Sequence, residues 1–134
     1  MGAISLYWAM EENSSGSGSG YLSDAQSHYS GLADGIGYWM MDWDNNQYPA
    51  LLQLAMATGS SSHASKIEFA IEEAINGGLG SYTPGGMWYL TQWGSARYPG
   101  NASFLALGWA KHLENIEGSQ STIDQYRNLS LIHI

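Results

Sequence analysis

Two acidic side chains flank a tryptophan in an aromatic segment of the first half of the chain. Asp42 and Asp44 stand on either side of Trp43, and Tyr38 and Trp39 precede them by a few residues. A pair of carboxylates beside aromatic rings is what a glycosidase uses as general acid and base. One of the two could instead accept hydrogen bonds from sugar hydroxyls, or cap the helix that follows. The residues alone leave catalysis and binding both open for this segment.

A second aromatic segment covers residues 81–93. Its rings are Tyr82, Trp88, Tyr89 and Trp93. Arg97 follows four residues after Trp93 and is the cation nearest to this segment in the sequence. Its guanidinium group could hold a carboxylate of the first segment, such as Asp44, or donate hydrogen bonds to sugar hydroxyls. Both interpretations place Arg97 in the same region as the aromatic rings.

The aromatic composition favours a surface that is partly in contact with water. The 134 residues include six Trp and nine Tyr but two Phe, and charged residues make up 12% of the chain. Trp and Tyr combine a flat apolar face with a polar group, which suits an uncharged ligand rich in hydroxyls, such as a sugar. A helical core rich in tryptophan is the alternative that composition leaves open. The length is enough for one ordinary domain.

Charge and cysteine content exclude several other classes of protein. Four Lys and Arg against twelve Asp and Glu give a net charge of -8, which argues against nucleic-acid partners and anionic membranes. There is no cysteine, so disulfides and thiolate chemistry are ruled out. The histidines lack the spacing of metal ligands and the glycines lack the spacing of a phosphate loop, so we expect no metal and no cofactor. No apolar run reaches the roughly 18 residues of a membrane span, and residues 1–134 contain no secretory signal.

Apolar spacing and stop signals predict helices and no sustained strands. Helices are expected over residues 3–10, 21–33 and 49–57, after Ser60–Ser62, and over residues 99–113. In the fourth of these, one apolar stripe is formed by Ile67, Ala70, Ile71, Ala74 and Ile75. Gly59 is expected to stop the third helix. The fifth is apolar around nearly its whole circumference, as is typical of a helix buried on both sides. The predicted fold class is all-α.

A repeat with an offset of 50 residues organises these helices. Trp43 is followed by Tyr48-Pro49 and an apolar helix, and Trp93 is followed in the same way by Tyr98-Pro99 and an apolar helix. A period of this length indicates a repeated supersecondary unit, here an antiparallel pair of an outer and an inner helix. Stacked in a ring, such pairs form an α/α barrel in which the loops before the inner helices share one end. The two aromatic segments are therefore expected on one face, where some rings could simply plug the barrel.

Several motifs occur in an order that resembles glycoside hydrolase family 9, whose members are mostly cellulases. These motifs are Trp43–Asn46 (WDNN), Thr83–Met87 (TPGGM), Trp93–Tyr98 (WGSARY) and Asn101–Leu107 (NASFLAL). Residues 3–10 and 21–29 resemble the helices on either side of the family's T-G-D turn. The chain departs from the family pattern at Pro99-Gly100, where two alanines are usual, at Asn45-Asn46, and in a longer Ser/Gly turn at residues 13–20.

The resemblance implies part of an (α/α)6 barrel and a parent protein that is an inverting endo-β-1,4-glucanase acting on cellulose or a related β-glucan. By resemblance, the positions that bind glucosyl units are Trp39, Asp44, Trp93 and Arg97. The family's catalytic base lies in a D-A-G-D element and its acid in an N-E element, so no catalytic residue is expected in residues 1–134. The alternatives are a non-catalytic carbohydrate-binding or structural helical module, another α/α-barrel glycosidase, or a polysaccharide lyase. The family also implies that the parent protein is extracellular.

The resemblance also suggests a boundary near the C-terminus. We expect residues 1–128 to be a fragment of a family 9 catalytic domain and residues 129–134 to be a non-native tail. Leu129–Ile134 is what translation of CTG TCT CTT ATA CAC ATC would give, a string that resembles a transposase adapter used in sequencing libraries. Residues 123–128 resemble the family's approach to its next helix, and the resemblance stops there. A native apolar strand is the alternative for the last residues.

Overall fold

The chain folds into helices joined by short connections and one small hairpin. The structure, a computed structural model, describes residues 1–12, 18–31, 45–75, 80–92 and 96–132. The described helices are α1 (Gly2–Glu12), α2 (Ser19–Gly31), α3 (Gln47–Thr58), α4 (Ser61–Ile75), α5 (Arg97–Asn115) and α6 (Gln120–Ile132). An antiparallel two-stranded sheet consists of β1 (Ser81–Tyr82) and β2 (Trp88–Tyr89). The predicted all-α class is confirmed.

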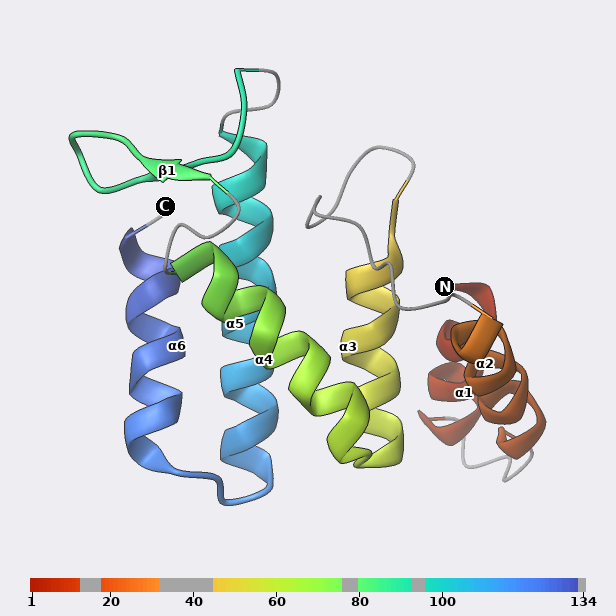
Figure 1. Cartoon of the computed structure of the whole chain (residues 1–134). Coiled ribbons are helices and arrows are strands. Elements are labelled where there is room, and N and C mark those ends of the chain that lie inside the picture. The colour runs from red at the N-terminus through yellow and green to blue at the C-terminus, as the bar shows by residue number, and fades with distance from the viewer. Residues whose placement is uncertain (13–17, 32–44, 76–79, 93–95, 133–134) are drawn as a thin grey trace.

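Helices that follow one another in the sequence pack as pairs. The most extensive contacts are between α5 and α6, α1 and α2, and α3 and α4. Figure 1 shows α5 and α6 side by side and antiparallel, with α4 crossing obliquely between α3 and α6. Both α3 and α5 begin at the end of the molecule where the hairpin lies. This is the arrangement of stacked helix pairs expected for part of an α/α barrel. No helix in the described ranges is long and apolar enough to cross a membrane.

The stop and start signals of the third and fifth predicted helices work as expected, with one shift. Gly59 caps α3 in a left-handed conformation, with φ of 61°, and its N–H donates to the carbonyl of Ala55. The helices α3 and α5 begin two residues before Pro49 and Pro99, which therefore lie inside the first turn. The N–H groups of a first turn have no partner within the helix, so proline costs no hydrogen bond there.

The core lies between α3, α4, α5 and α6. Its main members are Leu51, Leu52, Ile67, Ile71, Leu105, Ala106, Trp109, Ile123 and Tyr126, together with Trp88 of the hairpin. The apolar stripe predicted for α4 is buried at Ile67, Ala70 and Ile71, while the side chains of Ala74 and Ile75 lie outside the description. The helices α3 and α5 approach closely at Gly108, where a β-carbon would lie 2.9 Å from Leu52 Cδ2. Glycine at this position therefore sets the distance between the two repeated helices.

The helix α6 is not among the helices predicted from the sequence. It places Ile123, Tyr126 and Leu129 in the core, at a spacing of three residues that suits one face of a helix. The carboxylates of Glu68 and Glu72, together with burial, raise the pKa of Tyr126 to about 12. The expected boundary at residue 128 stays a prediction, because a helix can extend through native and non-native sequence alike.

Candidate functional site

The residues expected to bind substrate are only in part within the described structure. Trp39, Asp44 and Trp93 lie outside the described residues, whereas Arg97 is the first residue of α5. The segments that contain the first three lead directly into α3 and α5. Both helices begin at the same end of the molecule, next to the hairpin (Figure 1). The expectation that the two aromatic segments enter the molecule at one end is thus supported by the helices that follow them.

The repeated Tyr-Pro pairs occupy equivalent places at the start of these two helices. Tyr48 and Tyr98 are 6% and 2% exposed, and both prolines are buried beside them. Burial raises the pKa of Tyr48. Just before α3, the side-chain oxygen of Asn45 accepts a hydrogen bond from the N–H of Gln47 at 3.0 Å. Each pair therefore anchors the first turn of its helix in the core and fixes where the preceding segment ends.

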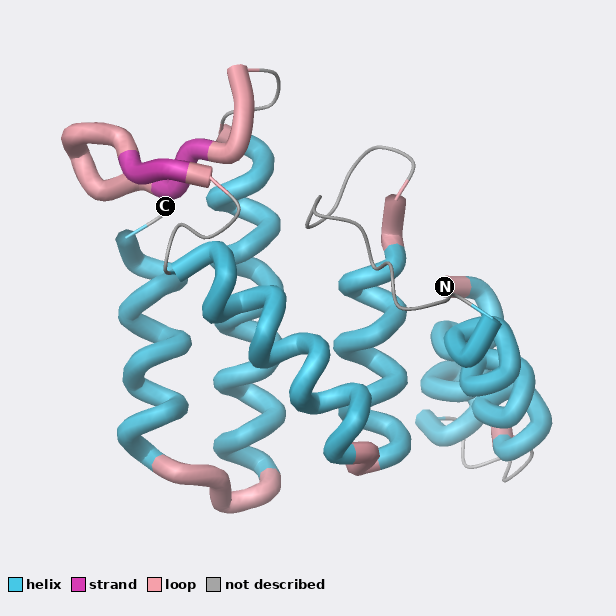
Figure 2. Tube along the Cα trace, viewed as in Figure 1, coloured by secondary structure: helices cyan, strands magenta, loops and turns pink. Residues whose placement is uncertain are grey.

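The TPGGM motif forms the turn of the hairpin (Figure 2). The carbonyl of Thr83 accepts a hydrogen bond from the N–H of Gly86 at 2.8 Å, and its hydroxyl accepts one from the N–H of Met87 at 3.0 Å. Its own N–H donates to the carbonyl of Met87 at 2.8 Å. Gly86 has φ of 84°, a left-handed conformation that glycine adopts without strain. The motif thus holds the two strands in a fixed register.

The hairpin separates two of the aromatic rings of the second segment. Tyr82 and Trp88 are directly opposite in the register, so both side chains are on the same face of the sheet. Trp88 is 0% exposed and belongs to the core, whereas Tyr82 is 43% exposed. At the base of the hairpin, a β-carbon on Gly80 would lie 2.5 Å from the carbonyl oxygen of Tyr89. Trp88 is therefore a packing residue, and Tyr82 is an aromatic surface at the site end.

Arg97 is held by the tyrosine that follows it. Its Nη2 donates to the hydroxyl oxygen of Tyr98 at 3.1 Å, and its guanidinium carbon lies 5.0 Å from the centre of the Tyr98 ring. The ring is buried while Arg97 itself is exposed. This contact was not predicted, although the two residues are adjacent in the sequence. It gives the guanidinium group a defined position at the surface.

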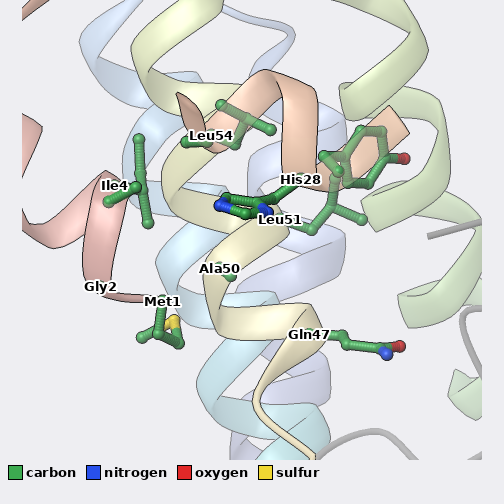
Figure 3. Close-up of a pocket in the computed structure, with 11 residues that line it drawn as sticks. Met1, Gly2, Ile4, His28, Gln47, Ala50, Leu51 and Leu54 are labelled. Carbon is green, nitrogen blue, oxygen red and sulfur yellow. The ribbon is translucent and has the colours of Figure 1, made fainter. Parts of the chain in front are cut away.

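A cavity elsewhere in the molecule has a different chemistry. It has a volume of about 390 Å³ and lies between α1, α2 and α3. Figure 3 shows Ile4, Leu51 and Leu54 around the ring of His28, with the amide of Gln47 directed away from them. An aliphatic lining with few polar groups offers a sugar little to bind its hydroxyls. Within the described ranges, no three His, Asp or Glu side chains are grouped so that they could hold a metal ion.

Comparison with known proteins identifies the family. The family model for glycosyl hydrolase family 9 matches residues 1–132. The chain belongs to glycosyl hydrolase family 9. It is 34% identical over 110 residues to an endoglucanase of Dictyostelium discoideum, covering 78% of this chain and 14% of that protein. It is 36% identical over 72 residues to endoglucanase B of Cellulomonas fimi, covering 52% of this chain and 7% of that protein.

A third family 9 relative and the structure search complete the comparison. Endoglucanase A of Bacillus pumilus is 33% identical over 84 residues, which cover 58% of this chain and 13% of that protein. No solved structure matches the chain significantly. The chain thus spans between 7% and 14% of the length of these three relatives. The resemblance read from the TPGGM and WGSARY motifs is confirmed at the level of the family.

Proposed function

We propose that this family 9 chain is part of the catalytic domain of an inverting endo-β-1,4-glucanase and carries part of its substrate cleft. The support is the family membership together with the endoglucanase relatives. The observation that carries the proposal is the exposed Arg97, anchored on Tyr98 at the end where α3 and α5 begin. The proposed substrate is cellulose or a related β-glucan, and the proposed location of the parent protein is extracellular.

The position of Arg97 favours ligand binding over a role in stability. It is the first residue of α5, where the positive end of the helix dipole disfavours a cation by about 0.3–1 kcal/mol. A residue chosen for stability at this position would be neutral or acidic. A guanidinium group that donates several hydrogen bonds in fixed directions suits the hydroxyls of a glucosyl unit. The proposed binding set is Arg97 with Trp39, Asp44 and Trp93, and the exposed ring of Tyr82 lies at the same end.

In this proposal the chain contributes to binding, and the acid and base are elsewhere in the parent protein. An inverting glycosidase needs one carboxylate that removes a proton from the attacking water and one carboxylic acid that protonates the leaving oxygen, roughly 6.5–9.5 Å apart. The D-A-G-D and N-E elements that resemblance associates with these roles do not occur in residues 1–134. The remaining candidates are Asp42 and Asp44, which are two residues apart in one segment.

The isolated chain is therefore expected to show no hydrolysis of cellulose or soluble β-glucan. The measurement is release of reducing sugar over that of a heat-treated sample. An Asp44→Asn variant is the control, and it is expected to be indistinguishable from the unmodified chain. Hydrolysis that Asp44→Asn abolishes would contradict the division of roles and make Asp44 a catalytic residue.

Binding is expected to depend on Arg97. We expect Arg97→Ala to reduce the fraction of chain retained on amorphous cellulose by about fivefold, because a charge-assisted contact is worth roughly 1–2 kcal/mol. Arg97→Lys should fall between the two, since an ammonium group lacks the planar fork. Lys111→Ala is the matched control, because Lys111 is an exposed cation further along the same helix and pairs with Glu114 at 3.0 Å. Equal losses for Arg97→Ala and Lys111→Ala would indicate non-specific charge effects and overturn the role of Arg97.

A further inference from the structure

A histidine at the start of α4 is held by a hydrogen-bond network that determines which nitrogen carries the proton. The hydroxyl of Thr58 donates to the carbonyl of Leu54 at 2.8 Å, so its single proton is used there. The same oxygen accepts a hydrogen bond from the N–H of Ser60 at 3.2 Å. His63 Nδ1 lies 3.1 Å from that oxygen, and the Thr58 proton is already engaged. Nδ1 of His63 must therefore be the donor, and the neutral ring carries its proton on Nδ1.

This ring forms a contact between helices that are not neighbours in the sequence. Tyr29 of α2 packs on it edge to face, with 4.7 Å between the ring centres. The ammonium group of Lys66, one turn further along α4, lies 5.2 Å from the centre of the same Tyr29 ring. The side chain of His63 is 9% exposed. The described groups facing His63 are thus the Tyr29 phenol ring from α2, the Thr58 hydroxyl from α3, and Lys66 from α4.

A second proton on the His63 ring has no compensating charge in this cluster. Burial, and to a lesser extent the positive charge of Lys66, lower the pKa of His63 below its ordinary value of 6.5. Since the folded-state pKa is depressed, the unfolded chain takes up the proton first as the pH falls. The stabilising contribution of this cluster is complete above about pH 6.5 and is lost as the pH falls below it.

From this geometry we infer that His63 is a pH-sensitive latch that holds α2 against the turn between α3 and α4. When the ring is neutral, it bridges Thr58 and Tyr29; when protonated, two cations face the same Tyr29 ring and the contact with α2 weakens. The consequence for the cleft rests on the proposed function. Residues 32–44, which include Trp39 and Asp44, connect α2 to α3, so loosening α2 releases one of the two anchors of that segment.

Hydrogen exchange of the backbone amides tests the latch without any substrate. Protection is measured for peptides of α2 and, as an internal reference, of α5, at about pH 7.5 and about pH 5 after correction for intrinsic exchange. In the unmodified chain, we expect α2 to lose several-fold of its protection at the lower pH while α5 keeps its own. In His63→Gln, whose amide can donate to Thr58 but does not titrate, the protection of α2 should be the same at both pH values.

Two further variants separate a latch from a general effect on stability. Tyr29→Phe removes a buried hydroxyl that has no hydrogen-bond partner among the described residues, and it keeps the ring, so the pH dependence should persist. His112→Gln replaces the other histidine whose pKa burial lowers, which packs on Trp109 in α5, and it should leave the loss in α2 unchanged. A loss of protection in α2 that persists in His63→Gln, or that α5 shares equally, would overturn the latch. Neither result would affect the proposed binding role of Arg97, which is tested at constant pH.

Discussion

Replacing Trp88 by alanine is expected to lower the free energy of unfolding by about 3–5 kcal/mol, the range for truncating a fully buried large aromatic residue. The side chain is 0% exposed and belongs to the core cluster, although it comes from a strand of only two residues. The strand β2 contacts α5, so Trp88 connects the hairpin to the helix that begins with Arg97. Its loss should therefore both destabilise the core and release the hairpin from the site end. Urea unfolding followed by far-ultraviolet circular dichroism measures the first effect.

The cross-strand neighbour of Trp88 provides the control for this prediction. Tyr82 is opposite Trp88 in the register but is 43% exposed. Tyr82→Ala should lower the free energy of unfolding by less than about 1 kcal/mol, as is usual for a partly exposed position. If both substitutions cost the same, Trp88 does not anchor the hairpin, and the division between a packing ring and a surface ring would be wrong.

Periodicity and stop signals predicted most helices because they depend on neighbouring residues. Gly59 ends α3 as expected, and the stripe through Ile67 and Ile71 is buried. The helix α6 was missed because residues 129–134 had been assigned to a tail, which removed Leu129 from the pattern that Ile123 and Tyr126 begin. The two-residue strands were missed for a different reason. Strands this short have too few residues for alternation to be recognised.

The common end of the site was predictable, but the roles of its residues were not. The 50-residue offset between the two Tyr-Pro pairs implies that α3 and α5 start at one end, as Figure 1 shows. In contrast, Tyr82 and Trp88 are both aromatic, and it is packing between distant parts of the chain that buries one and exposes the other. The contact of Arg97 with Tyr98 likewise depends on side-chain conformation. Sequence therefore indicates where a site is, while tertiary packing decides which of its rings meet solvent.

The second large effect expected is on self-association through α5. Phe104 and Leu107 are 55% and 50% exposed and lie three residues apart on one face of the helix. The sequence predicted a helix buried on both sides, and this face is not covered within the chain. In the proposed barrel, further helix pairs would cover it. The isolated chain is therefore expected to be helical but to associate, with dye binding and a weak near-ultraviolet signal.

Substituting both residues of this face by glutamine should weaken the association at least about tenfold. Burying each apolar side chain contributes about 1.5–3 kcal/mol, and about 1.4 kcal/mol corresponds to a factor of ten. Sedimentation velocity over a range of concentrations gives the comparison. The control is Phe69→Gln: Phe69 is 62% exposed on α4, but its neighbours Ser65 and Glu72 on the same face are polar and exposed, so little change is expected. A monodisperse monomer with a sharp cooperative melt before any substitution would contradict the prediction. Such a chain would close its own core, and the non-catalytic carbohydrate-binding module would then explain the fold better than part of a barrel.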